Sequence, residues 1–383
     1  MALLVGEVVL ATAVQPESFG SYALIRNALP LVVALGLLGF DQALTREAAA
    51  AAYFPRFGLR ALWVSARAVT LGAITGLILW SYLDLGLSYA AALVAATLGV
   101  AVSTVVSGVL RAASYDSRAA FAQQGHRLLT GLGLVCFSGL LTANTGGYLL
   151  AGSALVVATL SLFWSAKLLS PNLTSPIQQS TVGRLGYAFA LGMLTLAATD
   201  WVDQLLVAQQ ADLAATGIYS QAKLVAVYPM LSLGSVLGFL ALPWVAARRD
   251  EISAQIAAKL LFVTGGLAAG LGLLAFPIAL GGVKLIFDIQ LDAWTVSFFS
   301  IYGAVRLFYV VPSALSGGLC SPPQLGAFGV CTLITLPAQI GAFLLFLPAG
   351  TLTAAIAGSL LGITIRTALA ILFTFKAIGA PRS

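Results

Sequence analysis

The amino-acid sequence predicts an all-α polytopic membrane protein of about twelve transmembrane helices, in two pseudo-symmetric six-helix lobes around a central cavity. Composition, the spacing of apolar runs and a weak internal repeat support this prediction. Of 383 residues, 60% are hydrophobic and 8% charged, with mean hydropathy +1.00; soluble domains carry about 25% charged residues. So little charge cannot cover a soluble core. The continuous apolar runs also exclude disorder and an outer-membrane barrel, whose strands alternate in polarity.

Twelve hydrophobic segments can be read along the chain, against the roughly 20 apolar residues that a membrane helix needs. Their limits are 1–14, 21–44, 61–83, 86–110, 128–143, 147–170, 185–209, 216–245, 258–281, 293–318, 324–347 and 351–375. The first is short, so either a tilt completes it or the true start lies upstream of Met1. No basic region precedes it, so it is not predicted to be a cleavable signal peptide.

The basic residues orient these spans. Of the 19 lysines and arginines, five lie within spans and only Lys284 falls in a loop on the side opposite the termini. The rest share the side of the N-terminus: Arg46, Arg56, Arg60, Arg111, Arg118, Arg127, Lys167, Arg184, Arg248, Arg249, Lys259, Lys376 and Arg382. Positive loops face the cytoplasm, so both termini are predicted to be cytoplasmic. The net charge of +6 is therefore an orientation signal and requires no nucleic-acid partner.

The sequence contains no motif for soluble chemistry. Cys136, Cys320 and Cys331 fall in or beside apolar runs without metal-ligand spacing, and their odd number does not make a disulfide framework. There is no phosphate loop, HExxH pair or nucleophile elbow. We therefore expect neither enzyme activity nor a cofactor or metal site. The expected binding partners of the apolar surface are membrane lipids.

The chain divides at a polar segment between the sixth and seventh spans. Residues 171–183, PNLTSPIQQSTVG, are predicted to be a cytoplasmic linker between an N-terminal lobe (1–170) and a C-terminal lobe (184–383). FGSYALIRNAL in span 2 and TGIYSQAKLVA in span 8 align at an offset of 197 residues. This alignment pairs Gly20 with Gly217, Tyr22 with Tyr219 and Arg26 with Lys223, and it brings Glu7 within one residue of Asp203. Parallel repeats of this kind are a transporter plan.

Five basic residues lie within predicted spans, where each ionised side chain costs about 2.5–3.5 kcal/mol on translocon scales. They are Arg26, Lys223, Arg306, Arg67 and Arg366. Together they are candidates for a cationic cavity that binds an anionic substrate group such as a phosphate or pyrophosphate. The alternative is that each cation extends to the membrane surface or pairs with an acid.

Four acids also lie within spans, namely Asp203, Asp200, Asp41 and Glu7. Asp200 and Asp203 share a helix face, where they could couple transport to protons or sodium, or form structural pairs with Lys223 or Arg306. For Asp41, near Arg46, a contact at the helix end or between the lobes is the favoured interpretation. Acidic residues permit proton or sodium coupling without establishing it.

Four stretches resemble the oligosaccharide flippases of bacterial polysaccharide synthesis, in the superfamily that also contains multidrug exporters. They are PESFGSYALI (16–25), LGFDQALTREAA (38–49), DWVDQLLVA (200–208) and ATGIYSQAKLV (215–225). The resemblance implies two six-helix lobes around an alternately opening cavity in the bacterial inner membrane. It also implies transfer of undecaprenyl-pyrophosphate-linked oligosaccharide, with polysaccharide polymerase machinery as a candidate partner. Small-molecule export by the same fold is the alternative, and a polymerase or ligase is disfavoured by the short outer loops.

Overall fold

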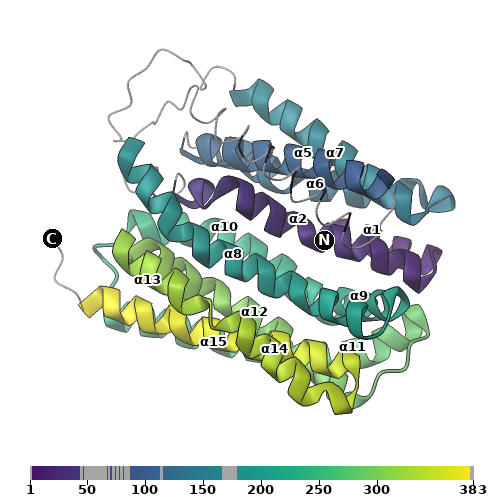
Figure 1. Cartoon of the computed structure of the whole chain (residues 1–383). Coiled ribbons are helices and arrows are strands. Elements are labelled where there is room, and N and C mark those ends of the chain that lie inside the picture. Colours follow the sequence, from purple (N-terminus) through teal and green to yellow (C-terminus); the bar gives the residue numbers. More distant parts are fainter. Residues whose placement is uncertain are drawn as a thin grey trace.

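The computed structural model describes residues 2–43, 87–112, 115–165 and 179–379, with a few single residues between 46 and 81, and every regular element in these ranges is helical (Figure 1). The first half comprises α1 (Ala2–Ala13), α2 (Pro16–Leu37), α5 (Leu87–Ala112), α6 (Asp116–Cys136) and α7 (Ala143–Ser165). The second comprises α8 (Gln179–Gln210), α9 (Leu213–Ala226), α10 (Tyr228–Ala247), α11 (Ala254–Phe287), α12 (Ala293–Leu319), α13 (Pro322–Thr332), α14 (Thr335–Phe346) and α15 (Thr351–Gly379).

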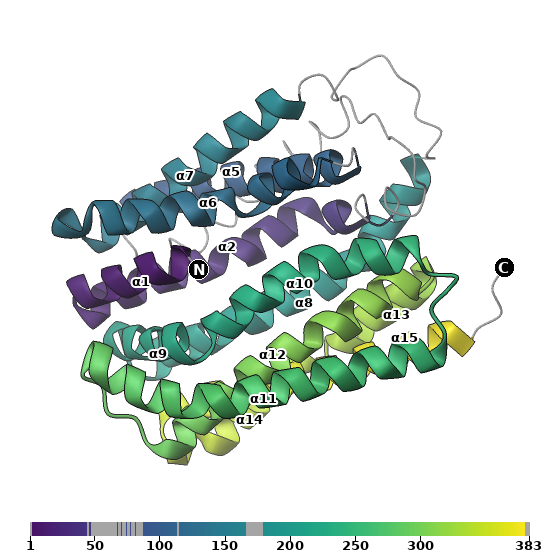
Figure 2. The ribbon, with the colours of Figure 1, turned by 180° about the vertical axis from the view of Figure 1, so that it is seen from behind.

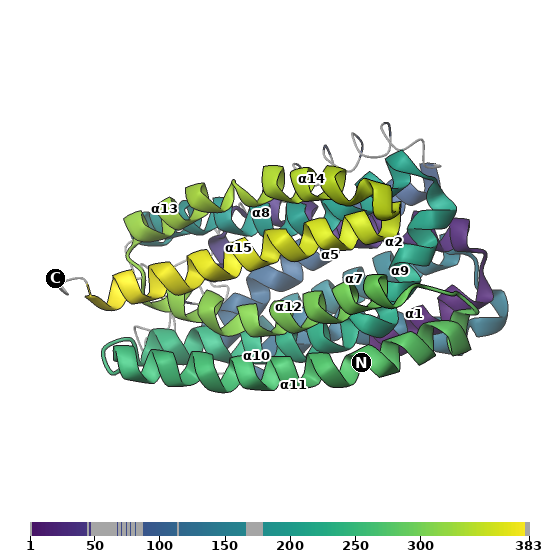
Figure 3. The same ribbon diagram turned by 90° about the horizontal axis from the view of Figure 1, so that it is seen from below.

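These helices confirm the predicted all-α membrane fold. Nine candidate spans in the described ranges are long and apolar enough to cross a membrane, and the 12-residue α1 is a shorter apolar helix. The third predicted span, 61–83, lies largely outside the described residues. Seen from behind, α1, α2, α5, α6 and α7 lie on one side of the bundle and α11–α15 on the other, with α8, α9 and α10 between them (Figure 2). The long helices of the second half run along the same direction (Figure 3).

Proline and capping residues set the helix limits more finely than hydropathy could. The predicted span 216–245 is broken at Val227, because Pro229 has no N–H to donate to the carbonyl of Val225. The predicted span 324–347 is broken at residues 333–334, where Pro337 likewise cannot donate to Leu333. Asp212 caps α9 by accepting a hydrogen bond from the backbone N–H of Ala215 at 2.6 Å.

Two predicted boundaries are corrected by the structure. Helix α8 begins at Gln179, so the last residues of the predicted linker 171–183 are helical, while 171–178 lie outside the described ranges. Helix α6 begins at Asp116, well before the predicted span 128–143, so Arg118 and Arg127 lie on a helix instead of in a loop. Hydropathy missed this because the first turns of α6 are rich in polar residues; one of them, Gln123, accepts a hydrogen bond from Arg111 of α5 at 2.6 Å.

The two aligned segments of the repeat cross each other at the end of the bundle that carries the α1–α2 turn. A Cβ added to Gly20 of α2 would overlap the carbonyl oxygen of Leu213, and one added to Gly217 of α9 would overlap that of Pro16. Pro16 and Leu213 are themselves equivalent under the offset of 197 residues. The crossing is therefore reciprocal, and glycine at both positions permits the close backbone approach.

Asp292 caps α12, whose predicted limits the structure confirms to within a residue. Its carboxylate accepts hydrogen bonds from the backbone N–H and the hydroxyl of Thr295, both at 2.7 Å. These bonds hold the pKa of Asp292 below its usual range. A lowered folded-state pKa means that the stabilisation is present above the pKa of the unfolded chain. It is lost as pH falls through the folded-state value.

We expect Asp292→Ala to destabilise the protein by about 1 kcal/mol at neutral pH, which is the usual cost of losing an N-cap. The deficit should shrink on acidification, because the wild-type cap is then lost too. Asp292→Asn keeps a capping oxygen that does not titrate, so it serves as the matched control. Thermal unfolding in detergent over an acid pH series measures all three proteins, and a pH-independent deficit in the alanine variant would contradict the capping role.

Candidate functional site

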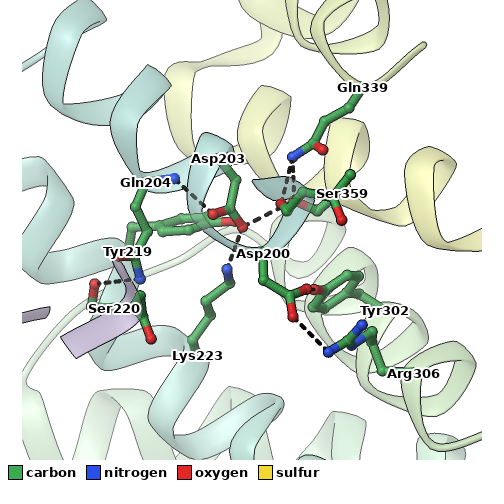
Figure 4. A network of polar contacts seen from close by, with 12 residues as sticks. Asp200, Asp203, Gln204, Tyr219, Ser220, Lys223, Tyr302, Arg306, Gln339 and Ser359 are labelled. Carbon is green, nitrogen blue, oxygen red and sulfur yellow. Dashed lines mark hydrogen bonds and ion pairs between the residues drawn. The ribbon is translucent and has the colours of Figure 1, made fainter. Parts of the chain in front are cut away.

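Asp203 of α8 is the centre of a sealed polar network in the second half of the chain. Its carboxylate forms an ion pair with Lys223 of α9 and accepts hydrogen bonds from the Tyr219 hydroxyl at 2.7 Å and the Ser359 hydroxyl at 2.9 Å (Figure 4). The Asp203 and Lys223 side chains are 0% and 4% exposed. Full burial with several donors fixes this carboxylate in place.

Neutral side chains extend the network to the neighbouring helices. Gln339 of α14 donates to the Ser359 hydroxyl of α15 at 3.2 Å and to the carbonyl of Thr199 in α8 at 3.0 Å. Gln204, next to Asp203, donates to Ser220 of α9 at 3.3 Å. Sequence reasoning missed these residues because isolated glutamines and serines carry no positional signal. The network ties four helices together.

Asp200 lies one turn from Asp203 and belongs to a more open ion pair. Its Oδ2 is 2.7 Å from Nη2 of Arg306 in α12, and its Oδ1 accepts from the Tyr302 hydroxyl at 3.2 Å (Figure 4). The Asp200 side chain is 34% exposed and that of Arg306 11%. The Nε and Nη1 atoms of Arg306 are buried without a hydrogen-bond partner. Arg306 therefore has donor capacity left for an anion.

The first half contains the counterpart of the Asp203 pair. Glu7 of α1 lies 2.7 Å from Arg26 of α2 and accepts from the Tyr22 hydroxyl at 3.2 Å. Glu7–Tyr22–Arg26 and Asp203–Tyr219–Lys223 are thus the same acid–tyrosine–base triad, one in each half. The first is more open, because the Arg26 side chain is 17% exposed.

Arg26 also reaches across to the second half of the chain. Its guanidinium lies 4.4 Å from the ring centroid of Tyr228, the first residue of α10. Asn27 donates to the Tyr228 hydroxyl at 3.4 Å, and Trp201 of α8 donates to the carbonyl of Leu24 at 3.2 Å. The open triad therefore lies where the halves meet.

Arg366 of α15 is buried among neutral acceptors. Its Nε donates to the Tyr309 hydroxyl and its Nη1 to the Thr195 hydroxyl, each at 2.8 Å, while Nη2 donates to the carbonyl of Gly192. The residue is 2% exposed, and no ion pair with an acid is found for it in the described part of the chain. Hydrogen bonds hold the guanidinium, but its positive charge is not neutralised there.

Two predicted site residues lie apart from these clusters. Asp41, beyond the end of α2, accepts from Gln42 at 3.0 Å, and nearby Arg46 donates to the carbonyl of Gly317 in α12 at 3.0 Å. The Arg46 contact joins the two halves, whereas the predicted helix-end or interlobe contact of Asp41 stays a prediction. Arg67 is partly exposed, and its Nε atom is buried without a hydrogen-bond partner among the described residues.

The structure therefore pairs Arg26, Lys223 and Arg306 each with an acid, which is the alternative that the sequence left open. Asp200 and Asp203 pair with Arg306 and Lys223 respectively. Whether any of the five bases contacts a substrate stays a prediction. Among the described residues, no group of three or more His, Cys, Asp or Glu side chains could hold a metal ion.

Comparison with known proteins places this geometry in context. A family model described as "Polysaccharide biosynthesis protein" matches residues 9–285. No curated protein sequence matches the chain. An outward-facing multidrug resistance MATE family transporter of the MOP superfamily matches with TM-score 0.66 and 14% identity, covering 98% of this chain and 91% of the other. An inward-facing one matches with TM-score 0.61 and 15% identity, covering 98% and 94%. These TM-scores show a shared fold.

Proposed function

The chain belongs to the family of polysaccharide biosynthesis proteins, and from this premise we propose that it is a lipid-linked oligosaccharide flippase. Its family and fold are those of multi-pass membrane transporters. The proposed substrate is an undecaprenyl-pyrophosphate-linked oligosaccharide, moved from the inner to the outer leaflet by alternating access. The proposed setting is the bacterial inner membrane with both termini cytoplasmic, which the distribution of basic loops supports.

The observation that carries this proposal is that the guanidinium of Arg306 has unused hydrogen-bond donors. Two of its nitrogen atoms, Nε and Nη1, are buried without a hydrogen-bond partner, and each buried donor left unpaired costs about 1–3 kcal/mol. A phosphate oxygen is a strong acceptor for an arginine fork. The Asp200 side chain, which pairs with this guanidinium, is 34% exposed, and this exposure indicates that the ion pair borders an accessible space. Arg26 offers a second reachable cation on the other half of the chain.

The balance of buried charge also favours an anionic substrate. The predicted spans of the second half contain two acids, Asp200 and Asp203. They contain three bases, namely Lys223, Arg306 and Arg366, so the bases outnumber the acids. A cavity for cationic drugs should instead carry an excess of acids or aromatic cages. Small-molecule export is therefore the alternative that the experiment below must exclude.

In a deletion strain, we expect pyrophosphate-linked oligosaccharide to accumulate on the cytoplasmic leaflet and wild-type protein to reverse this. Arg306→Gln should restore little export, because losing charge-assisted hydrogen bonds worth about 1.5–3 kcal/mol weakens headgroup binding roughly 10–100-fold. The measurement is extraction of the lipid-linked pool together with staining of surface polysaccharide.

Arg249→Gln is the matched control, because Arg249 is exposed outside the spans and should leave export unchanged. Full export by the Arg306 variant would show that Arg306 does not bind the anionic headgroup. If the lipid-linked pools of the deletion strain are unchanged and the strain becomes more sensitive to drugs, the protein is instead a small-molecule exporter.

A further inference from the structure

We propose that Asp200 is an exchangeable counter-ion, so that the anionic headgroup and one proton bind together. The headgroup displaces the Asp200 carboxylate from Arg306, and the freed carboxylate takes a proton from solvent, forming an O–H bond. This inference rests on the proposed flippase function, and it adds that a proton binds together with the substrate.

The first step follows from the two acids of α8, which differ in how firmly they are held. Asp203 is fully buried and has three side-chain donors from two other helices. Asp200 has one nitrogen of Arg306 and one hydroxyl of Tyr302, and a third of its side chain is exposed. Asp200 can therefore leave its partners at lower cost, and water can reach it.

The second step follows from the geometry of Arg306. Its link to Asp200 uses only Nη2, while Nε and Nη1 have no partner. A pyrophosphate that binds the free donors brings its negative charge beside the Asp200 carboxylate. Like charges repel strongly in a poorly solvated interior, so the carboxylate must move, be neutralised or both.

The third step is the balance of charge around Asp200. The ionisable groups on the helices that surround it include Asp203, Tyr219, Lys223, Tyr302, Arg306, Tyr309 and Arg366, together with Tyr22 and Arg26 on α2 and Glu7 on α1. With the tyrosines neutral, Asp200, Asp203 and the three bases of the second half leave one positive charge. A disubstituted pyrophosphate brings about two negative charges. One proton then restores neutrality, and Asp200 is the less firmly held acid.

The proposal predicts a linkage between pH and affinity. The bound state holds one more proton than the free state, so binding is favoured at low pH. In the pH range where each binding event takes up one full proton, the Kd should rise about tenfold for each unit by which pH rises. A variant with an uncharged residue at position 200 needs no proton, so its affinity should not depend on pH.

The test is calorimetric titration of the full-length protein in detergent with a short-chain polyprenyl-pyrophosphoryl sugar. This disubstituted pyrophosphate does not titrate near neutral pH, and repeating the titration in buffers of different ionisation enthalpy counts the protons taken up. We expect uptake approaching one proton per bound molecule for the wild type and none for Asp200→Asn. Asp288→Asn is the matched control, because Asp288 is an exposed helix C-cap in a left-handed conformation that asparagine also adopts.

Each outcome decides between the claims. Wild-type binding without proton uptake would overturn the counter-ion exchange and leave the flippase proposal standing. Uptake that persists in a folded Asp200→Asn variant would overturn the assignment to Asp200. Failure of the wild type to bind the probe would contradict the proposed function itself, and this inference with it. The wild-type titration is decisive even if the asparagine variant does not fold.

Discussion

Asp203→Asn is expected to lower the free energy of unfolding by about 3–5 kcal/mol, because it leaves the Lys223 ammonium buried without its carboxylate. The pair is almost completely shielded from solvent, so water cannot replace the lost partner. Lys223→Met should have an effect of similar size, since it leaves Asp203 charged with only hydroxyl and backbone donors. Chemical or thermal unfolding in detergent measures both variants.

The double variant Asp203→Asn/Lys223→Met separates the ion pair from packing. It removes both charges, so it should be clearly more stable than either single variant. Asp250→Asn and Lys259→Met place the same substitutions at exposed positions and should change stability little. Single variants that cost no more than these controls would show that Asp203 and Lys223 do not form a buried ion pair.

Gly217→Ala should disrupt the crossing of α2 and α9 and abolish export. The new Cβ would overlap the carbonyl oxygen of Pro16, and backbone cannot rotate away as a flexible side chain can. The two helices must separate, at a cost of about 1–3 kcal/mol or more. In the proposed orientation this crossing lies at the outer end of the bundle, where it holds the two halves together, so the variant should favour the outward-open state. Thermal unfolding and complementation of a deletion strain measure the two effects.

Gly266→Ala on α11 is the matched control for this substitution. No atom lies within 4 Å of a Cβ at that position, so the alanine should be neutral or slightly stabilising through its higher helix propensity. Gly20→Ala, at the equivalent position of the repeat, should reproduce the defect of Gly217→Ala. Wild-type export by both crossing variants would show that the tight contact is not needed.

The internal repeat was the most informative feature of the sequence. It placed Arg26 opposite Lys223 and Tyr22 opposite Tyr219, and in the structure each of these bases and tyrosines contacts an acid. Ionisable side chains are rare in membrane spans. Two of them at matching positions therefore make even a short alignment informative.

The partners and the exposure of each charge could not be predicted in the same way. Periodicity shows that Asp200 and Asp203 share a helix face, but not that one is sealed and the other open. Arg366 finds only neutral acceptors, which no charge pattern could indicate. The start of α6 was missed because its first turns are polar, and average hydropathy does not register a contact such as the one between Gln123 and Arg111 of α5.

The reciprocal crossing at Gly20 and Gly217 has the form of an isologous interface, in which one surface meets a copy of itself. In a dimer of identical subunits, any substitution in such a surface changes both sides simultaneously. Joining the two copies in a single polypeptide removes that constraint. The fused chain therefore retains glycine on both sides of the crossing, while one copy pairs a partly exposed arginine with a buried glutamate and the other pairs a buried lysine with a buried aspartate.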